Sequence, residues 1–158
     1  MAKLKTLIVF AGAALMFGQS YSGPRPPSPD LPYLLHADKL IPLEATEARQ
    51  SSAKDEDVYV IKGDSSPVKT PMAEPMFVYE PGQIPPERMK LYKLEVRNGN
   101  REAVFSSKKR KNTVREFHLS ITRLSDKLFR IEAAESLENG QYSLSPTDSN
   151  HVFCFEVF

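Results

Sequence analysis

The stretch from Glu116 to Phe158 most constrains the fold, because apolar and polar residues alternate along much of it with a period of two. Such alternation is typical of half-buried β-strands, in which successive side chains point to opposite faces of a sheet. Turn residues divide the stretch at Ser125-Asp126 and at Asn139-Gly140. Four antiparallel strands are therefore predicted here, of which the last is Val152–Phe158.

The upstream chain adds further short strands separated by proline-rich connections. Asp57–Lys62 is rich in β-branched residues and ends before a glycine. In Met89–Val96 the alternation slips by one residue between Leu91 and Leu94, which predicts either a bulge or a strand buried on both faces. Ala45–Ala53 lacks an apolar pattern and is predicted to be a short helix or a loop. In total the sequence predicts an all-β chain of about eight short strands, folded as an antiparallel sandwich.

Leu137, Gly140 and Tyr142 carry a family resemblance. They resemble the corner before the sixth strand of immunoglobulin-like sandwiches, where a tyrosine hydroxyl bonds to backbone upstream. With the run up to Val157, the chain resembles uncharacterised secreted bacterial proteins that have a small immunoglobulin-like β-sandwich. It departs from true immunoglobulin domains in having no Trp and no Cys pair, and Leu144 stands where the second Cys would follow. The resemblance covers roughly a quarter of the chain and implies a sandwich, but no catalytic residue.

The N-terminal segment has the pattern of a secretory signal peptide. Lys3 and Lys5 precede the uncharged run Leu7–Phe17. This run has about eleven residues, whereas a membrane-spanning helix needs about twenty, so a cleaved signal is favoured over a retained anchor. The predicted organisation is a signal peptide at 1–22, a proline-rich spacer at 23–32 in an extended conformation, and a single β-sandwich domain at 33–158.

Charge and cysteine content narrow the function classes. The chain has 21 basic and 20 acidic residues, and two of the basic residues lie in the predicted signal. The mature chain is then close to neutral, so it has no general attraction for nucleic acid or an acidic membrane. Cys154 is the single cysteine, so no disulfide can form within the chain and stability must come from packing.

A basic run and the single cysteine each suggest a chemical role. The basic run Lys108–Lys111 could bind phosphates or an anionic polysaccharide, but no aromatic residue interleaves it, and it is interpreted as a solvated loop. Cys154 with His118 or His151 could form a nucleophile and base. Cys154 lies within an apolar strand, however, where a cysteine usually packs as a small hydrophobe. If the phenylalanine side of that strand faces the core, Cys154 is expected to lie half covered near the surface.

His36 and Asp38 have the spacing that places two ligands on one side of a strand, and zinc would require at least one more donor, such as His118, His151 or a carboxylate. Three histidines are ordinary for a chain of this size. No catalytic, cofactor-binding or metal-binding residue is therefore assigned, and no cofactor is expected.

The expected function is that of a non-enzymatic binding or structural module of the bacterial cell envelope, secreted or periplasmic. Its expected partners are another envelope protein or a polysaccharide, with no nucleic acid and no stable membrane span after signal cleavage. Two alternatives remain. One is a small hydrolase or metal-dependent enzyme that uses His36, Asp38 and His118. The other is a fibre or secretion-apparatus subunit that works by β-strand addition.

Export yields the first testable prediction. Small residues before the cleavage point favour processing after Ser20 or after Ser22, so the secreted protein should begin at Tyr21 or Gly23. Intact-mass spectrometry of the exported protein measures this directly. Protein that retains Met1 and is recovered from the soluble cytoplasmic fraction would show that the segment is not a cleaved signal.

Overall fold

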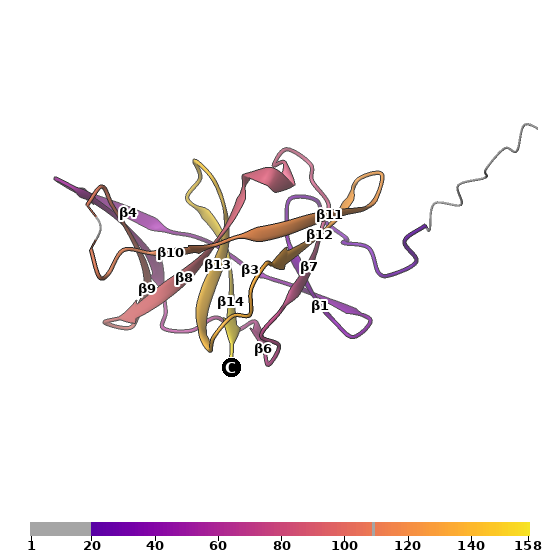
Figure 1. The fold of residues 1–158 in the computed structure, drawn as a ribbon, viewed down its shortest axis with the longest axis horizontal. Coiled ribbons are helices and arrows are strands. Elements are labelled where there is room, and N and C mark those ends of the chain that lie inside the picture. The colour runs from indigo at the N-terminus through magenta and orange to yellow at the C-terminus, as the bar shows by residue number, and fades with distance from the viewer. Residues whose placement is uncertain (1–19, 109) are drawn as a thin grey trace, which may run out of the picture.

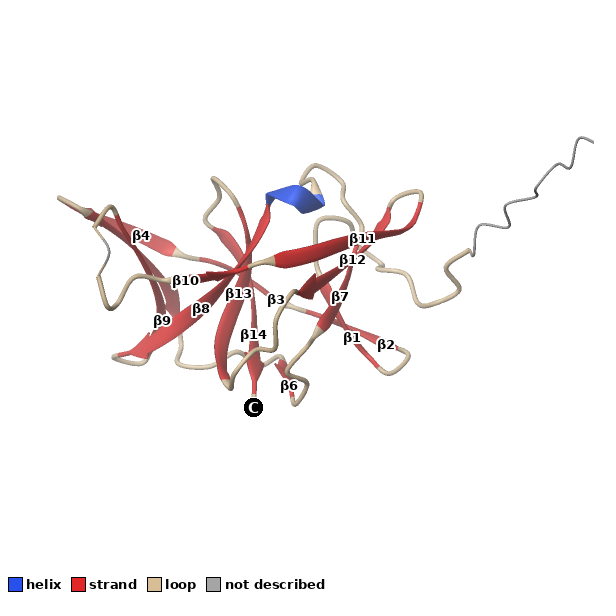
Figure 2. Ribbon diagram, in the orientation of Figure 1, coloured by secondary structure: helices blue, strands red, loops and turns tan. Residues whose placement is uncertain are grey.

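The computed structural model describes residues 20–108 and 110–158 (Figure 1). Residues 1–19, which hold most of the predicted signal peptide, lie outside the described part. Strands follow one another through nearly all of the described chain, with one short 3₁₀ helix, η1 (Pro86–Arg88), before the eighth strand (Figure 2). The strands are β1 (Tyr33–His36), β2 (Lys39–Pro42), β3 (Glu44–Glu47), β4 (Arg49–Ala53), β5 (Glu56–Lys62), β6 (Lys69–Thr70), β7 (Met76–Tyr79), β8 (Met89–Arg97), β9 (Asn100–Ser106), β10 (Arg115–Phe117), β11 (Leu119–Ser125), β12 (Leu128–Ala133), β13 (Gly140–Pro146) and β14 (His151–Val157).

The strands form two sheets. The five-stranded sheet has the order β11-β12-β7-β1-β2, and the nine-stranded sheet has the order β3-β14-β13-β8-β9-β5-β4, with β10 added to β8 and β6 added to β14. The paired strands are antiparallel, apart from the short parallel pairing of β6 with β14. The prediction of an all-β antiparallel sandwich is confirmed. The described residues contain more strands than the predicted eight or so, chiefly because polar segments also join the sheets.

The sandwich core lies between the five-stranded sheet and one face of the strands β8, β13 and β14. Phe153, Phe155 and Val157 share this face of β14, as their alternation predicts. Phe155 packs against Phe77 of the opposite sheet, with ring centroids 5.0 Å apart. Rings at this spacing contribute packing energy beyond the apolar area that they bury, so this contact helps to hold the two sheets together.

The opposite face of β8, β13 and β14 is also covered. Leu91 packs in the sandwich core, whereas Leu94, three residues later, belongs to a second buried cluster together with Val152 and Cys154. The slip in the alternation of β8 therefore marks a strand buried on both faces, which is one of the two outcomes that the sequence predicts. These central strands serve two cores, one on each side.

The second core exists because the nine-stranded sheet curls back on itself. Strands β3 and β4 stand at its two ends, yet only Ala48 separates them in the chain, so the chain joins one end of the sheet to the other. The prediction of a helix or loop at Ala45–Ala53 is wrong in this respect. Most of these residues are exposed, which explains the missing apolar pattern, and the ladders with β14 and β5 make the segment extended.

The corner predicted around Tyr142 is present in the structure. Tyr142 is fully buried, and its hydroxyl donates a hydrogen bond of 2.7 Å to the backbone carbonyl of Glu138. The predicted bond to upstream backbone is therefore confirmed. Leu137 is also buried in the sandwich core, so the segment that enters β13 is held by a polar and an apolar contact.

The end of the predicted spacer is anchored to the domain through Asp30. Its carboxylate accepts hydrogen bonds from the backbone N–H groups of Gly82 (2.8 Å), Gln83 (2.8 Å) and Ile84 (3.0 Å), and from the hydroxyl of Tyr79 (3.1 Å). Partial burial raises the pKa of Asp30, but these donors outweigh it, and the pKa lies below its ordinary value. The chain thus joins the folded body a few residues before β1.

The Tyr142 corner generates a stability prediction. Tyr142→Phe removes one buried hydrogen bond and leaves the Glu138 carbonyl without this partner, so the free energy of unfolding should fall by roughly 1–3 kcal/mol. Tyr33→Phe is the matched control, because Tyr33 is also buried in β1 but lies outside the corner. Urea denaturation of both variants measures the difference. Equal midpoints for Tyr142→Phe and the parent protein would show that the bond contributes nothing.

Candidate functional site

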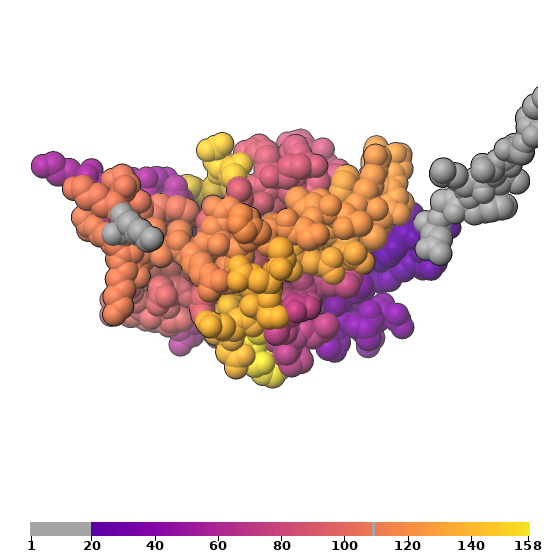
Figure 3. Space-filling model, in the orientation of Figure 1, coloured from indigo at the N-terminus to yellow at the C-terminus, as the bar shows by residue number. Residues whose placement is uncertain are grey.

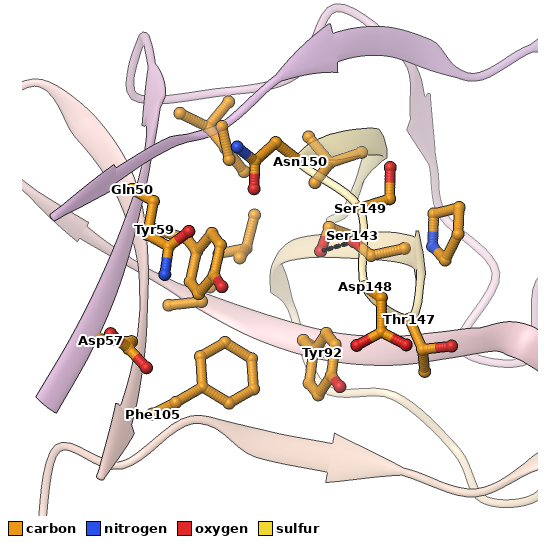
Figure 4. A pocket seen from close by; sticks show the side chains of 17 residues that line it. Gln50, Asp57, Tyr59, Tyr92, Phe105, Ser143, Thr147, Asp148, Ser149 and Asn150 are labelled. Carbon is orange, nitrogen blue, oxygen red and sulfur yellow. Dashed lines mark hydrogen bonds between the residues drawn. The ribbon is translucent and has the colours of Figure 1, made fainter. Parts of the chain in front are cut away.

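The curled part of the large sheet encloses a cavity of about 570 Å³, which we call the cup (Figure 4). It is bounded by β4, β5, β9, β8 and the hairpin of β13 and β14. Sites for small organic ligands typically measure roughly 300–1,000 Å³ and combine apolar walls with a few polar groups. The size of the cup falls within that range.

The floor of the cup is apolar. Four of its side chains come from four different strands of the curled sheet, and all are buried: Ile61, Leu94, Ala103 and Val152. Their inward direction follows from strand alternation, which sends the neighbouring residues to the outer face or to the sandwich core. The floor therefore offers contact to the hydrocarbon part of a ligand.

One wall of the cup is aromatic. Phe105 of β9 lies between Tyr59 of β5 and Tyr92 of β8, with ring centroids 5.5 Å and 5.2 Å apart (Figure 4). The ring planes meet at 83° and 86°, the edge-to-face arrangement that aromatic pairs favour. Burial, and then the negative charge of Glu116, raise the pKa of Tyr92 above its ordinary value.

The turn between β13 and β14, residues 147–150, forms the facing wall. The backbone N–H of Thr147 donates to the carbonyl of Arg88 (2.9 Å), and the carbonyl of Asn150 accepts from the N–H of Ala48 (2.8 Å). Figure 3 shows the yellow residues of this turn standing beside the pink segment of η1. Because the turn is held at both ends, backbone hydrogen bonds within the protein fix this wall.

Two buried serines add polar groups beside the floor. Ser143 and Ser145 both line the cup from β13, and their hydroxyl oxygens lie 3.0 Å apart in a mutual hydrogen bond. A hydroxyl can donate once and accept twice, so this single bond leaves further hydrogen-bonding capacity on the pair. The pair provides directional contacts within an otherwise apolar surface.

The charged residues that line the described part of the cup are both acidic. Asp57 comes from β5 and Asp148 from the turn, and Lys, Arg and His do not occur among the described lining residues. The hydroxyl of Ser52 donates to the Asp57 carboxylate. The cup is therefore aromatic, rich in hydroxyl groups and negative.

A buried ion pair holds the sheet together beneath the cup. Arg101 precedes Ala103 and Phe105 on the inner face of β9, and its side chain is 1% exposed. Its guanidinium donates to both carboxylate oxygens of Glu44 on β3, at 2.6 and 2.9 Å. It also donates to the backbone carbonyls of Lys62 and Gly63, each at 3.0 Å. One side chain thus connects β9, β3 and the end of β5.

The structure does not bring together the residues of the enzyme alternative. His36 ends β1, whereas His118 directly precedes β11, and two strands, β7 and β12, lie between β1 and β11. At about 4.8 Å per strand this places them about 14 Å apart, whereas zinc ligands bind within about 2.1 Å of one ion. In the described ranges, no three His, Cys, Asp or Glu side chains gather as a metal would require.

Cys154 is fully buried in the second core, which confirms that it packs as a small hydrophobe. The expectation that it lies half covered near the surface is wrong, because the curled sheet covers the face of β14 opposite the sandwich core. Burial raises its pKa to about 12, against the opposing effect of Arg101. His151 is exposed, 3.6 Å from Glu47. A thiol that stays protonated is a poor nucleophile.

Lys108, Arg110 and Lys111 of the basic run belong to the connection between β9 and β10, as the interpretation of the run as a loop predicts, and Lys109 lies outside the described residues. Lys108 pairs with Asp55 at 2.9 Å, and Arg110 pairs with Glu56. Asp55 directly precedes β5, and Glu56 is the first residue of that strand. The two cations are therefore neutralised locally at the rim of the curled sheet, which leaves them less available to an anionic ligand.

Sequence reasoning missed the cup entirely. A usable signal was present in β13, where the small polar residues Ser143 and Ser145 alternate with Tyr142 and Leu144. All of these residues are buried, so the polar face of a central strand marks a second, hydroxyl-lined interior. The closure of the cup by the segment 45–53 had no comparable signal, because that segment contributes few buried side chains.

No protein-family model matches the chain, and neither the curated proteins nor the solved structures provide a match. Among the residues that the structure describes, no helix has the length and apolar character that crossing a membrane requires.

The ion pair beneath the cup generates a second stability prediction. Glu44→Gln keeps the shape but removes the countercharge of buried Arg101, so the free energy of unfolding should fall by about 3 kcal/mol. That is the lower end of the range for breaking a buried pair, because the Glu44 side chain keeps 20% exposure. Asp55→Asn breaks the exposed pair with Lys108 and should cost no more than about 1 kcal/mol. Denaturant unfolding measures both variants, and an equal loss of unfolding free energy in Glu44→Gln and Asp55→Asn would contradict this ranking.

Proposed function

We propose that this chain is an exported, non-enzymatic binding module of the bacterial cell envelope, secreted or periplasmic, and that its ligand binds in the cup. The signal-peptide pattern around Lys3 and Lys5 supports export, and the resemblance of the Tyr142 corner to secreted bacterial sandwich proteins supports an envelope role. The expected partners are an envelope protein or a polysaccharide that presents a group small enough for the cup.

The observation that carries this proposal is the cavity itself. Its aromatic wall and its turn wall flank an apolar floor, and both walls are fixed by the hydrogen bonds and ladders already described. A site that is ordered before binding spends little free energy on ordering its side chains. A concave, ordered and partly polar cavity is the usual form of a binding site.

Binding is favoured over catalysis because of the groups that converge. Those in the cup contribute aromatic faces, hydroxyls, amides and carboxylates, whereas His36 and Asp38 lie at the turn from β1 to β2, separated from His118 by β7 and β12. Cys154 is buried beneath the floor with a raised pKa. This arrangement suits recognition of a ligand without a chemical step.

Strand addition is the second candidate, and the observation that favours it is the free edge of β4. All five residues of β4 are exposed, and β4 pairs with β5 alone. An unpaired edge is a template for an added strand, and β4 contains neither proline nor lysine, two residues that commonly block such pairing. A partner that pairs here would lie beside the cup.

The test is to obstruct the cup. Gln50 points into it from β4, whereas the adjacent Ser51 does not line it, so Gln50→Trp and Ser51→Trp place the same ring on opposite faces of one strand. We expect a tagged parent protein and Ser51→Trp to co-purify a partner from the native envelope fraction, and Gln50→Trp to lose it. Equal denaturation midpoints confirm that both variants are folded.

Three results would contradict the proposed function. Retention of the partner by Gln50→Trp would place binding outside the cup. Loss with Ser51→Trp alone would favour strand addition at the β4 edge. Failure of the folded parent protein to enter the envelope fraction would overturn the envelope role.

A further inference from the structure

We propose that the cup recognises an organic ammonium group, either a substituted amine on a small molecule or such a group on an envelope polymer. This inference rests on the proposed function, because it names the chemical class that the same cavity would take. It is carried by two independent features of the cup, the arrangement of its aromatic rings and the placement of its charges.

Neighbouring rings of the aromatic wall are set nearly at right angles to one another. The plane of Phe105 stands nearly perpendicular to those of Tyr59 and Tyr92, so the rings face the cavity from different directions (Figure 4). Each ring face is electron-rich, and a cation within about 6 Å of the ring centre is attracted to it. Rings set at right angles can surround one cation on several sides, which a parallel stack cannot do.

A carboxylate lies next to the aromatic wall. Asp57 is the direct cross-strand partner of Phe105 in the ladder of β5 and β9, and Tyr59 follows two residues later on the same face of β5. Directly opposed residues have Cβ atoms about 4.5–5.5 Å apart, so the carboxylate and the Phe105 ring can contact the same bound group. Asp148 supplies a second negative charge from the facing turn.

The charge balance then favours a cation over an anion or a neutral ligand. The described lining residues include no cation to offset the two carboxylates, so an anion would enter against unfavourable charge. A neutral ligand could use the Ser143–Ser145 pair, the apolar floor and contacts with the ring faces, but it would lack the charge attraction of Asp57 and the cation–π attraction of the rings. A cation uses all of these groups, and a desolvated one gains most from the rings.

The size of the cavity indicates a group larger than a bare ammonium ion. At about 570 Å³ the cup leaves space over Ile61, Leu94 and Ala103 for methyl or methylene groups attached to the nitrogen. Such substituents also reduce the hydration of the cation, so less free energy is lost when it leaves water. Choline therefore serves as the probe, with a trimethylammonium head and a hydroxyl that can reach the serine pair.

The experiment compares three probes of nearly equal shape. Choline carries the positive charge, 3,3-dimethylbutan-1-ol is its neutral isostere, and 3,3-dimethylbutyrate carries a negative charge. ¹H–¹⁵N NMR titration of the full mature protein gives each dissociation constant and maps the shifted amides. We expect choline to bind at least roughly tenfold more tightly than the alcohol, the anion to bind most weakly, and the shifts to cluster at the cup.

Matched variants assign the preference to residues. Phe105→Leu and Asp57→Asn should each weaken choline binding by roughly tenfold and change binding of the alcohol less than twofold. Phe129→Leu and Asp38→Asn make the same substitutions away from the cup and should leave both dissociation constants unchanged. Added salt should weaken choline binding to the parent protein and have little effect on the alcohol.

The outcomes separate this inference from the function on which it rests. Equal affinity for choline and the alcohol, with shifts at the cup, would overturn the ammonium inference and leave the cup as a binding site. Choline-induced amide shifts that lie outside the cup would also overturn it, as would the absence of choline binding at about 50 mM. The proposed function is judged separately, by whether Gln50→Trp loses the envelope partner.

Discussion

The structure depends on the way Arg101 holds the curled sheet closed. A guanidinium presents five N–H donors in a rigid plane, and here they reach a carboxylate on β3 and two carbonyls at the end of β5. A buried cation without such partners would cost several kcal/mol, so the side chain is stable only when β3, β5 and β9 converge. The ion pair therefore selects the curled arrangement over an open sheet, and the cup above it is a consequence.

The cup is hollow because β13 and β14 present small side chains on this side. On the sandwich side, β13 and β14 present Tyr142, Leu144 and Phe155, which fill the space against the second sheet. On the other side the same strands present Ser143 and Cys154, which leave space. Interiors normally pack without voids larger than a water molecule. The space that remains here is open to solvent and partly polar, which makes it suitable for a ligand.

The sequence predicts the fold to the extent that alternation reports burial. The face of β14 that holds Phe153 follows from local pattern, and the two-sided burial of β8 is one of the two outcomes that its pattern predicts. The hydrogen bond of Tyr142 is predicted from the resemblance to immunoglobulin-like sandwiches. The segment 45–53 could not be predicted in the same way, because its role is to supply backbone hydrogen bonds and not buried side chains. The anchoring of Asp30 likewise depends on a turn some fifty residues away.

The candidate site is harder to predict than the fold, since it belongs to no single stretch. Tyr59, Phe105 and Asn150 meet only after the sheet has curled, and each is unremarkable in its own segment. The residues that look chemically active in the sequence, such as His36 and Cys154, are placed at the end of a strand or in a core. The candidate site therefore forms only when the sheet closes, and that closure depends on contacts between residues far apart in the sequence.

Because Cys154 is buried, the reactivity of its thiol reports how often the fold around it opens. With a pKa of about 12 and no solvent contact, the thiol offers almost no thiolate to an oxidant or an alkylating reagent while the fold is intact. Exposure requires β14 to separate from β3 or the floor of the cup to open. The rate at which this one sulfur becomes modified therefore measures how often the centre of the protein unfolds, without any added label.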